Sequence, residues 1–193
     1  MKVTRQILEK QSKSWLVERL LELSGVDSAN ADRILLSLSV AQSDEAAVIA
    51  DFKQQIEKAI AEIDGHGPGT WKSILPSEGF DAVADALTIV LSKNMFNAVI
   101  ETTEYALVKL DSIFELQDEC ELEYLVDAFR HLHLEACQRS APDVRTLGAR
   151  LAELCKQTEW GFFDGPPDGY AHILGQEGLA AYIAQLKPER TRS

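Results

Sequence analysis

The sequence has little cysteine, and its cysteines lack the spacing of a metal site or a disulfide framework. Cys120, Cys137 and Cys155 are the only three, and each falls within an apolar helical pattern. Zinc sites and redox motifs need closely spaced pairs such as C-x-C or C-x-x-C, and neither occurs. We therefore expect reduced thiols buried in a hydrophobic core, and we predict no cofactor.

Long apolar runs and strongly basic segments are also missing. No run approaches the ~20 residues that cross a bilayer, and the N-terminus is too polar for a signal peptide. Basic residues number 19 against 31 acidic ones, which gives a formal net charge of −12. That charge repels a phosphate backbone. We therefore predict no membrane partner, no nucleic-acid partner and a cytoplasmic location.

Strand signals are absent as well, whereas helical periodicity runs through almost the whole chain. No sustained alternation of β-branched residues occurs, and apolar residues recur at steps of three and four. With 46% hydrophobic residues, such a chain can bury a core. The pattern predicts an all-α protein with helices over 15–23, 28–38, 43–63, 80–91, 94–110, 119–138, 146–155, 170–174 and 176–186.

The stretch 80–110 gives the clearest architectural signal. Two apolar helical segments flank a short break at 92–94, and small Ala98 and Ala106 alternate with large side chains as in a packed antiparallel helix pair. Pairs of this kind build α-solenoids, whose usual product is a binding surface. Because the helix lengths are uneven, we predict an irregular antiparallel helical-hairpin array rather than a regular repeat.

Glycine and proline gather at 64–69, where the sequence reads DGHGPG. A helix cannot continue through such a segment, so it marks a candidate boundary. We predict an N-terminal helical unit over 1–64, a C-terminal helical-repeat array over 70–187 and a tail over 188–193. One continuous domain is the alternative.

Two resemblances to known families follow from the residues themselves. Asn94 to Leu110 resembles the second half of a tetratricopeptide repeat, with Asn94 at the turn and Phe96 at the aromatic position. Over 98–186, the strings IETTEYAL, HLEAC, LAEL and YAHILGQEGLA are similar to the helical region of a bacterial family of uncharacterised proteins, found alone or after a SWIM-type zinc finger. The finger's C-x-C and C-x-H pairs are absent here. The resemblance therefore implies a helical, tetratricopeptide-like fold without zinc, and no particular activity.

Negative charge is concentrated in the segment 101–135, which has ten acidic and two basic residues. A basic protein or peptide could dock on such a surface by electrostatic complementarity. The alternative is a solvated face that keeps an apolar array soluble. The acidic band that would form the partner surface consists of Glu115, Asp118, Glu119, Glu121, Glu123 and Asp127.

One group of residues has a spacing suited to a divalent cation. Asp127, His131 and Glu135 are four residues apart on one predicted helix and share a face. The alternative is a solvated stripe with local ion pairs. His133 lies roughly opposite and cannot bind the same ion as His131 from that helix.

No catalytic motif occurs elsewhere, so we predict a protein–protein interaction or scaffold module. Two alternatives stay open: a structural or accessory subunit of a complex, and a metal-assisted enzyme built around Asp127, His131 and Glu135.

Overall fold

We analysed a computed structural model of the chain, which describes residues 36, 44–64, 77–113, 119–158 and 169–186. Every regular element in these ranges is a helix, which confirms the all-α prediction. No described helix is long and apolar enough to cross a membrane. The helices are α4 (Glu45–Asp64), α5 (Ser77–Ser92), α6 (Phe96–Ile113), α7 (Glu119–Ser140), α8 (Val144–Gln157) and α9 (Ala171–Leu186).

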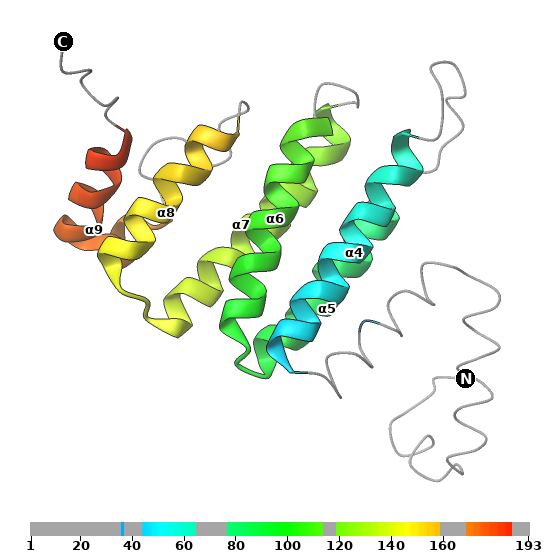
Figure 1. Cartoon of the computed structure of the whole chain (residues 1–193), viewed down its shortest axis with the longest axis horizontal. Helices are drawn as coiled ribbons and strands as arrows, with labels where there is room; N and C mark the ends of the chain where they lie inside the picture. Colours follow the sequence, from blue (N-terminus) through cyan, green and yellow to red (C-terminus); the bar gives the residue numbers. More distant parts are fainter. Residues whose placement is uncertain (1–35, 37–43, 65–76, 114–118, 159–168, 187–193) are drawn as a thin grey trace, which may run out of the picture.

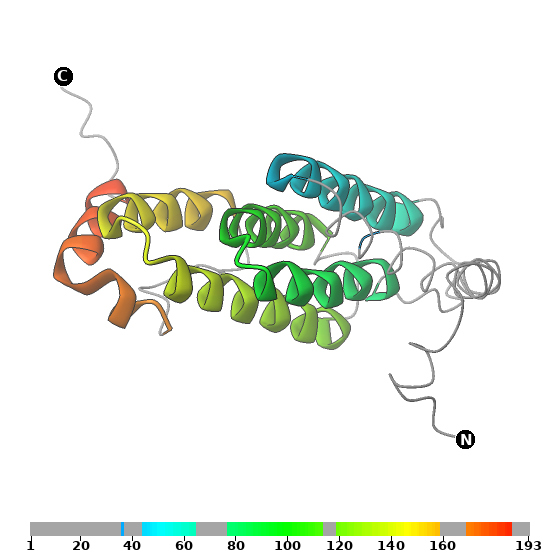
Figure 2. The same cartoon turned by 90° about the horizontal axis from the view of Figure 1, so that it is seen from below.

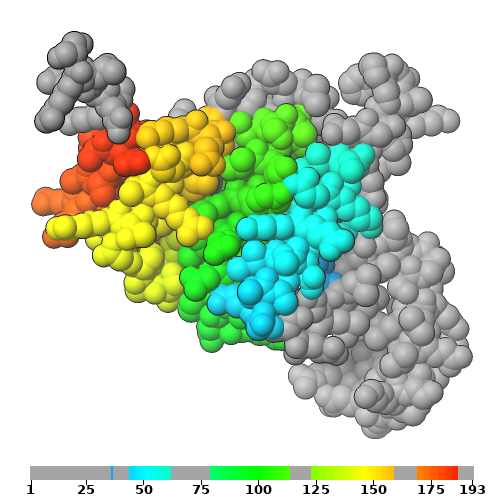
Figure 3. Space-filling model, viewed as in Figure 1, coloured from blue at the N-terminus to red at the C-terminus, as the bar shows by residue number. Residues whose placement is uncertain are grey.

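The helices stack in two layers and run alternately up and down (Figures 1 and 2). One layer contains α4, α6 and α8, which form a continuous face in Figure 3. The other contains α5 and α7, and α9 covers α8 at the end of the stack farthest from α4. Helix α5 therefore lies beside α7 and parallel to it, with α6 packed across both in the neighbouring layer.

The predicted break between 80–91 and 94–110 is confirmed, and the two segments form neighbouring antiparallel helices, but their mutual contact is only a small part of the packing of α6. Asn94 forms the turn in the left-handed region, at φ 61°. Helix α6 nevertheless packs most extensively against α7 and then against α4, and its contact with α5 is small. The reason is the wide apolar surface of α6, which buries residues on several sides, including the fully buried Ala98 and Ala106.

Helix α4 shows how local sequence and packing combine. Asp44 accepts a hydrogen bond from the Ala47 N–H at 2.8 Å and so caps the helix. Phe52 and Ile56 are fully buried against α5 and α6. Glu45 reaches across and accepts a hydrogen bond from the Ala98 N–H at 3.0 Å, in the first turn of α6. One helix therefore satisfies a free amide at the start of another.

Helices α8 and α9 cross with their backbones close together at Gly148 and Gly178. Asp143 caps α8 by accepting from the Thr146 N–H at 2.8 Å. A Cβ atom added to Gly148 would lie 2.1 Å from the Gly178 carbonyl oxygen, so only glycine fits this crossing. At Gly175, φ is 55°, and the kink there confirms the predicted division of the last helical segment.

Several sequence predictions lie outside the described residues. These are the helices 15–23 and 28–38 apart from the buried Leu36, the boundary segment 65–69, and the tail 188–193. Of the cysteines, Cys137 is a free and fully buried thiol, as predicted. Cys155 has a reduced thiol and is only partly buried, because it lies at the edge of the apolar face of α8.

Candidate functional site

The structure places only part of the acidic band. Glu115 and Asp118 lie outside the described residues, as do the side chains of Glu119 and Glu121, whose backbone forms the first turn of α7. Glu123 and Asp127 are exposed on α7. Their exposure is compatible both with docking and with a solvated face.

A shallow groove of about 620 Å³ lies between α5 and α7. Its floor is apolar, because Leu91 and Leu132 are buried there and the small Ala84 and Ala128 leave room above them. The two helices run parallel on either side, so the groove follows their length. The full lining comprises Ala84, Asp85, Thr88, Leu91 and Ser92 from α5 and Ala128, His131, Leu132, Glu135 and Arg139 from α7.

Both ends of this surface are fixed by polar contacts. At one end the Tyr124 hydroxyl donates to the Asp81 carboxylate, at 3.1 and 3.2 Å from its oxygens. At the other end Arg139 donates to the Asn94 side-chain oxygen at 2.9 Å and stands 5.2 Å from the centre of the Phe96 ring. Arg139 also pairs with Glu135 at 3.4 Å. The groove therefore has ordered polar groups at both ends and an apolar floor.

The predicted metal ligands do not form a cluster. His131 and Glu135 line the groove, Asp127 precedes them by one turn, and Glu135 is paired with Arg139. Within the part of the chain that the structure describes, no three His, Cys, Asp or Glu side chains are placed to hold a metal ion. Because the three residues follow one another at steps of one turn along the same helix, their side chains lie apart and do not converge on one point.

A buried polar cluster, which the sequence reasoning missed, lies deeper in the stack. His133 is fully buried, and its Nε2 donates to Glu104 Oε1 at 3.2 Å. The other oxygen of Glu104 accepts from the partly exposed Arg150, at 2.7 Å from Nε and 2.5 Å from Nη2. His133 Nδ1 is hydrogen-bonded to the Tyr170 hydroxyl on its other side. The chain Arg150–Glu104–His133–Tyr170 thus joins α8, α6, α7 and the start of α9.

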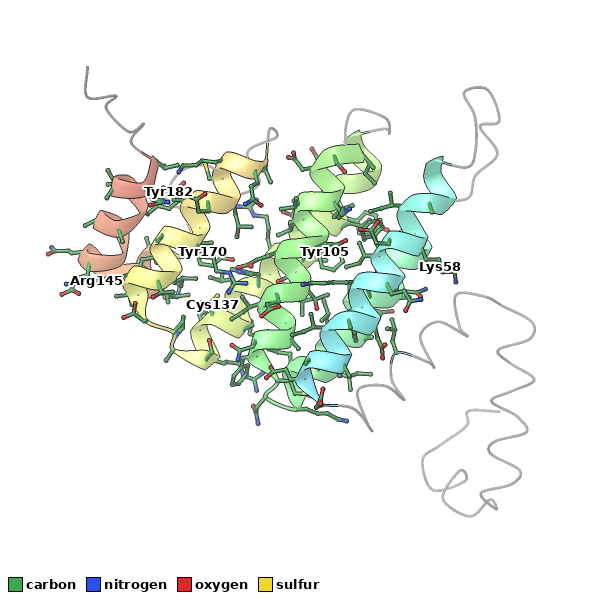
Figure 4. All side chains as sticks on the ribbon, in the orientation of Figure 1. Lys58, Tyr105, Cys137, Arg145, Tyr170 and Tyr182 are labelled. Atoms are coloured by element: carbon green, nitrogen blue, oxygen red, sulfur yellow. The ribbon has the colours of Figure 1, made fainter. Side chains whose placement is uncertain are left out.

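Cys137 lies next to this cluster, and Figure 4 shows it with Tyr170 in the space between α6 and α8. Its sulfur is 3.8 Å from His133 Nδ1. Burial raises the pKa of the Cys137 thiol from 9.0 to about 12, and burial also raises the pKa of Tyr170. A thiol that stays protonated and inaccessible is a poor nucleophile, so a cysteine–histidine contact here does not make a protease-like site. The cluster instead fixes how four helices meet.

The sequence did contain a signal for this cluster. Glu104 follows Ile100 by four positions and precedes Leu107 by three, so it occupies a core position of α6. His133 lies in the same way between Phe129 and Cys137 on α7. Ionisable residues at core positions require partners when they are buried.

A second ordered network lies on the surface between α4 and α6, around Tyr105 (Figure 4). The Tyr105 hydroxyl donates to Glu57, which also pairs with Lys109 at 2.7 Å. Lys53 and Lys109 each stand 5.4 Å from the centre of the Tyr105 ring. The hydrogen bond from Lys109 lowers the pKa of Glu57. Lys53 also pairs with Glu101 of α6 at 3.8 Å. Each lysine therefore has an acidic partner, and the network joins α4 to α6.

No family profile, curated protein or solved structure matches this chain.

Proposed function

We propose that this chain is a protein-interaction or scaffold module of the tetratricopeptide-like, α-solenoid kind, and that its α5–α7 groove takes a peptide or helix from a partner protein. The groove itself carries the proposal. Its volume of about 620 Å³ and apolar floor suit a few apolar side chains of a bound segment. The antiparallel two-layer stacking of the helices is the geometry by which such arrays present extended surfaces.

The charge around the groove favours a basic partner segment. Asp85 lies on the α5 rim, and Glu123 and Asp127 continue the α7 side beyond His131. The chain as a whole has a net charge of −12, so its long-range field attracts cations and repels acidic proteins. We infer a segment with apolar anchors for the floor and lysine or arginine side chains for the rim.

We also propose a cytoplasmic location and kinship with the bacterial helical family whose motifs this sequence resembles. The buried free thiol of Cys137 fits a reducing compartment, where thiols stay unpaired. An accessory-subunit role is compatible with the same surface, because a subunit of a complex also docks through a groove.

Selection from a randomised peptide library tests the proposal. We expect the selected peptides to combine apolar and basic residues and to shift amide NMR signals of α5 and α7. Thr88→Trp should block binding by filling the groove, and Asp85→Lys should weaken it. Asp51→Lys, an equal charge reversal at an exposed position of α4, is the matched control and should leave binding unchanged.

Ionic strength and the acidic band give further readouts. Binding should weaken between low and physiological salt, where the Debye length falls to ~8 Å. Glu121→Lys with Glu123→Lys should mainly slow association. Peptides that bind Thr88→Trp and Asp85→Lys as tightly as the wild type would show that the groove is not the docking site.

A further inference from the structure

The α5–α7 groove lies on the side of its layer that faces away from α6. Asp85, Thr88 and Ser92 line the groove and are exposed, whereas the opposite sides of α5 and α7 are buried against the neighbouring layer. Helix α6 packs across both of these helices and runs antiparallel to them (Figure 2). The groove therefore offers, on the outside, the same pair of parallel helices that α6 covers on the inside.

The surroundings of the groove favour a helix over an extended chain as its occupant. An extended peptide gains affinity by adding a strand to a sheet edge, and every regular element in the described ranges is a helix. Proline-rich segments bind between aromatic side chains, and the groove lining includes no Phe, Tyr or Trp. A helix satisfies its own backbone hydrogen bonds and needs only an apolar seam. The buried Leu91 and Leu132, with the small Ala84 and Ala128 above them, form such a seam.

The two ends of the groove differ in charge. Asp81 and Asp85 lie at the end nearer the N-terminus of α5, and the hydroxyl that donates to Asp81 is neutral and leaves the carboxylate its charge. At the other end, the carboxylate of Glu135 is paired with Arg139 at 3.4 Å, and Lys93 directly follows α5. The first end is therefore negative relative to the second.

The backbone dipoles of α5 and α7 also distinguish the two ends. Because these helices run parallel, their C-terminal turns, which carry partial negative charge, both lie at the Arg139 end of the groove. A third helix is favoured there by its partially positive N-terminus, so it runs antiparallel to both, as α6 does. Its C-terminal turn then lies near Asp81 and Asp85. Basic side chains in that turn are favoured by these carboxylates and by the helix's own dipole.

Resting on the function proposed above, we propose that the groove binds an amphipathic helix of a partner protein that runs antiparallel to α5 and α7, with acidic residues in its first turn and basic residues in its last. The α7 lining extends from Ala128 to Arg139, so about three turns of helix, roughly 17 Å, fit along it. Apolar anchors one turn apart on that helix face the floor of Leu91 and Leu132.

A synthetic helical peptide of about 14 residues, long enough to span the groove, tests the orientation in complex with the full chain. It has leucines one turn apart, glutamates in its first turn, lysines in its last turn and a nitroxide spin label at one end. An N-terminal label should broaden the amide NMR signals around Ser92 and Arg139, and a C-terminal label those around Asp81 and Tyr124. The opposite pattern, or equal broadening of both ends by either label, would overturn the inferred orientation.

A companion peptide with the glutamates and lysines exchanged tests the charge pattern. It should bind about three- to tenfold more weakly, the effect of two exposed charge pairs. Both peptides carry the same side-chain staple, and circular dichroism checks that their helicity is equal. Arg139→Gln should reduce the difference in affinity between the peptides, whereas Arg145→Gln, at an exposed position of α8, should leave it unchanged. Equal affinity of the two peptides for the wild type would show that the groove does not read this pattern.

Failure of this inference is distinguishable from failure of the groove as a docking site. Peptides selected from the random library that lose binding in Thr88→Trp, but show no helical signal when bound, would keep the groove and overturn the helix. A helical probe that does not bind, beside selected peptides that do, would have the same meaning. A probe that binds Thr88→Trp as tightly as the wild type would overturn both proposals for the groove.

Discussion

Replacing Gly148 by alanine tests the close crossing of α8 and α9, because two opposite effects compete there. Alanine is favoured over glycine inside a helix by about 1 kcal/mol. Against this, the new Cβ would lie 2.1 Å from the Gly178 carbonyl oxygen and 3.0 Å from its carbon. Ordinary contacts are about 3.5 Å or longer, so α8 and α9 would have to separate by more than about 1 Å.

The magnitude follows from what surrounds the new methyl group. All the nearest atoms belong to the backbone of Gly178, so no side chain can rotate away. Overpacking of this kind costs about 3 kcal/mol, at the upper end of its usual range. After the gain in helix propensity, we expect a net loss of about 2 kcal/mol. Urea unfolding followed by circular dichroism should then show a midpoint lower by about 1 M, for a typical slope near 2 kcal/mol per molar.

A control separates the two effects. Ala180→Gly, at an exposed position of α9, should cost about 1 kcal/mol through helix propensity alone. Gly178→Ala should behave like Gly148→Ala, since its Cβ would lie 2.7 Å from the Val144 carbonyl oxygen. A Gly148→Ala protein as stable as the wild type, or more stable, would refute the close crossing of α8 and α9.

Three further predictions concern the core. Glu104→Ala leaves His133 and Arg150 without their shared carboxylate and should lower the free energy of unfolding by about 3 kcal/mol. Glu104→Gln keeps an acceptor for His133 and should lower it less. Equal losses of stability for the two variants in urea unfolding would contradict the network. Because burial raises the pKa of Cys137 from 9.0 to about 12, the folded protein holds this proton more tightly than the unfolded chain does, so its contribution to stability is full below pH 9 and is lost between pH 9 and about pH 12. Cys137→Ala should reduce this alkaline loss of stability. An identical dependence of stability on pH in the variant would argue against burial of the thiol. Ala106→Phe should cost ~1–3 kcal/mol by overpacking a fully buried site, and an unchanged denaturation midpoint would show that the site has room.

The sequence predicted helix positions well because apolar periodicity reports the buried face of each helix directly. The predicted helix 119–138 corresponds to α7 (Glu119–Ser140), and the predicted helix 43–63 corresponds to α4 (Glu45–Asp64). The division at Gly175 was predicted from the same pattern. Periodicity does not say which helix covers a buried face, and the packing of α6 mainly on α7 rather than on α5 was therefore missed.

The candidate site was harder to predict because its parts are distant in the sequence. The groove forms where α5 and α7 lie side by side, although the whole of α6 separates them along the chain. The buried cluster joins Glu104 to His133, 29 positions later, and His133 to Tyr170, 37 positions later. A sequence can show that Glu104 is out of place on an apolar face, but the choice of partner depends on how the layers meet.

The chain of hydrogen bonds from Arg150 through Glu104 and His133 to Tyr170 bears on how the stack comes apart. In a simple linear array each helix pair touches only its neighbours, so the ends fray before the middle unfolds. Here Tyr170, the residue before α9, has its hydroxyl hydrogen-bonded to His133 of α7, and His133 is hydrogen-bonded in turn to Glu104 of α6. Release of α9 would leave the buried imidazole of His133 without one of its hydrogen-bond partners. The end of the stack should therefore unfold together with its centre, as one cooperative unit.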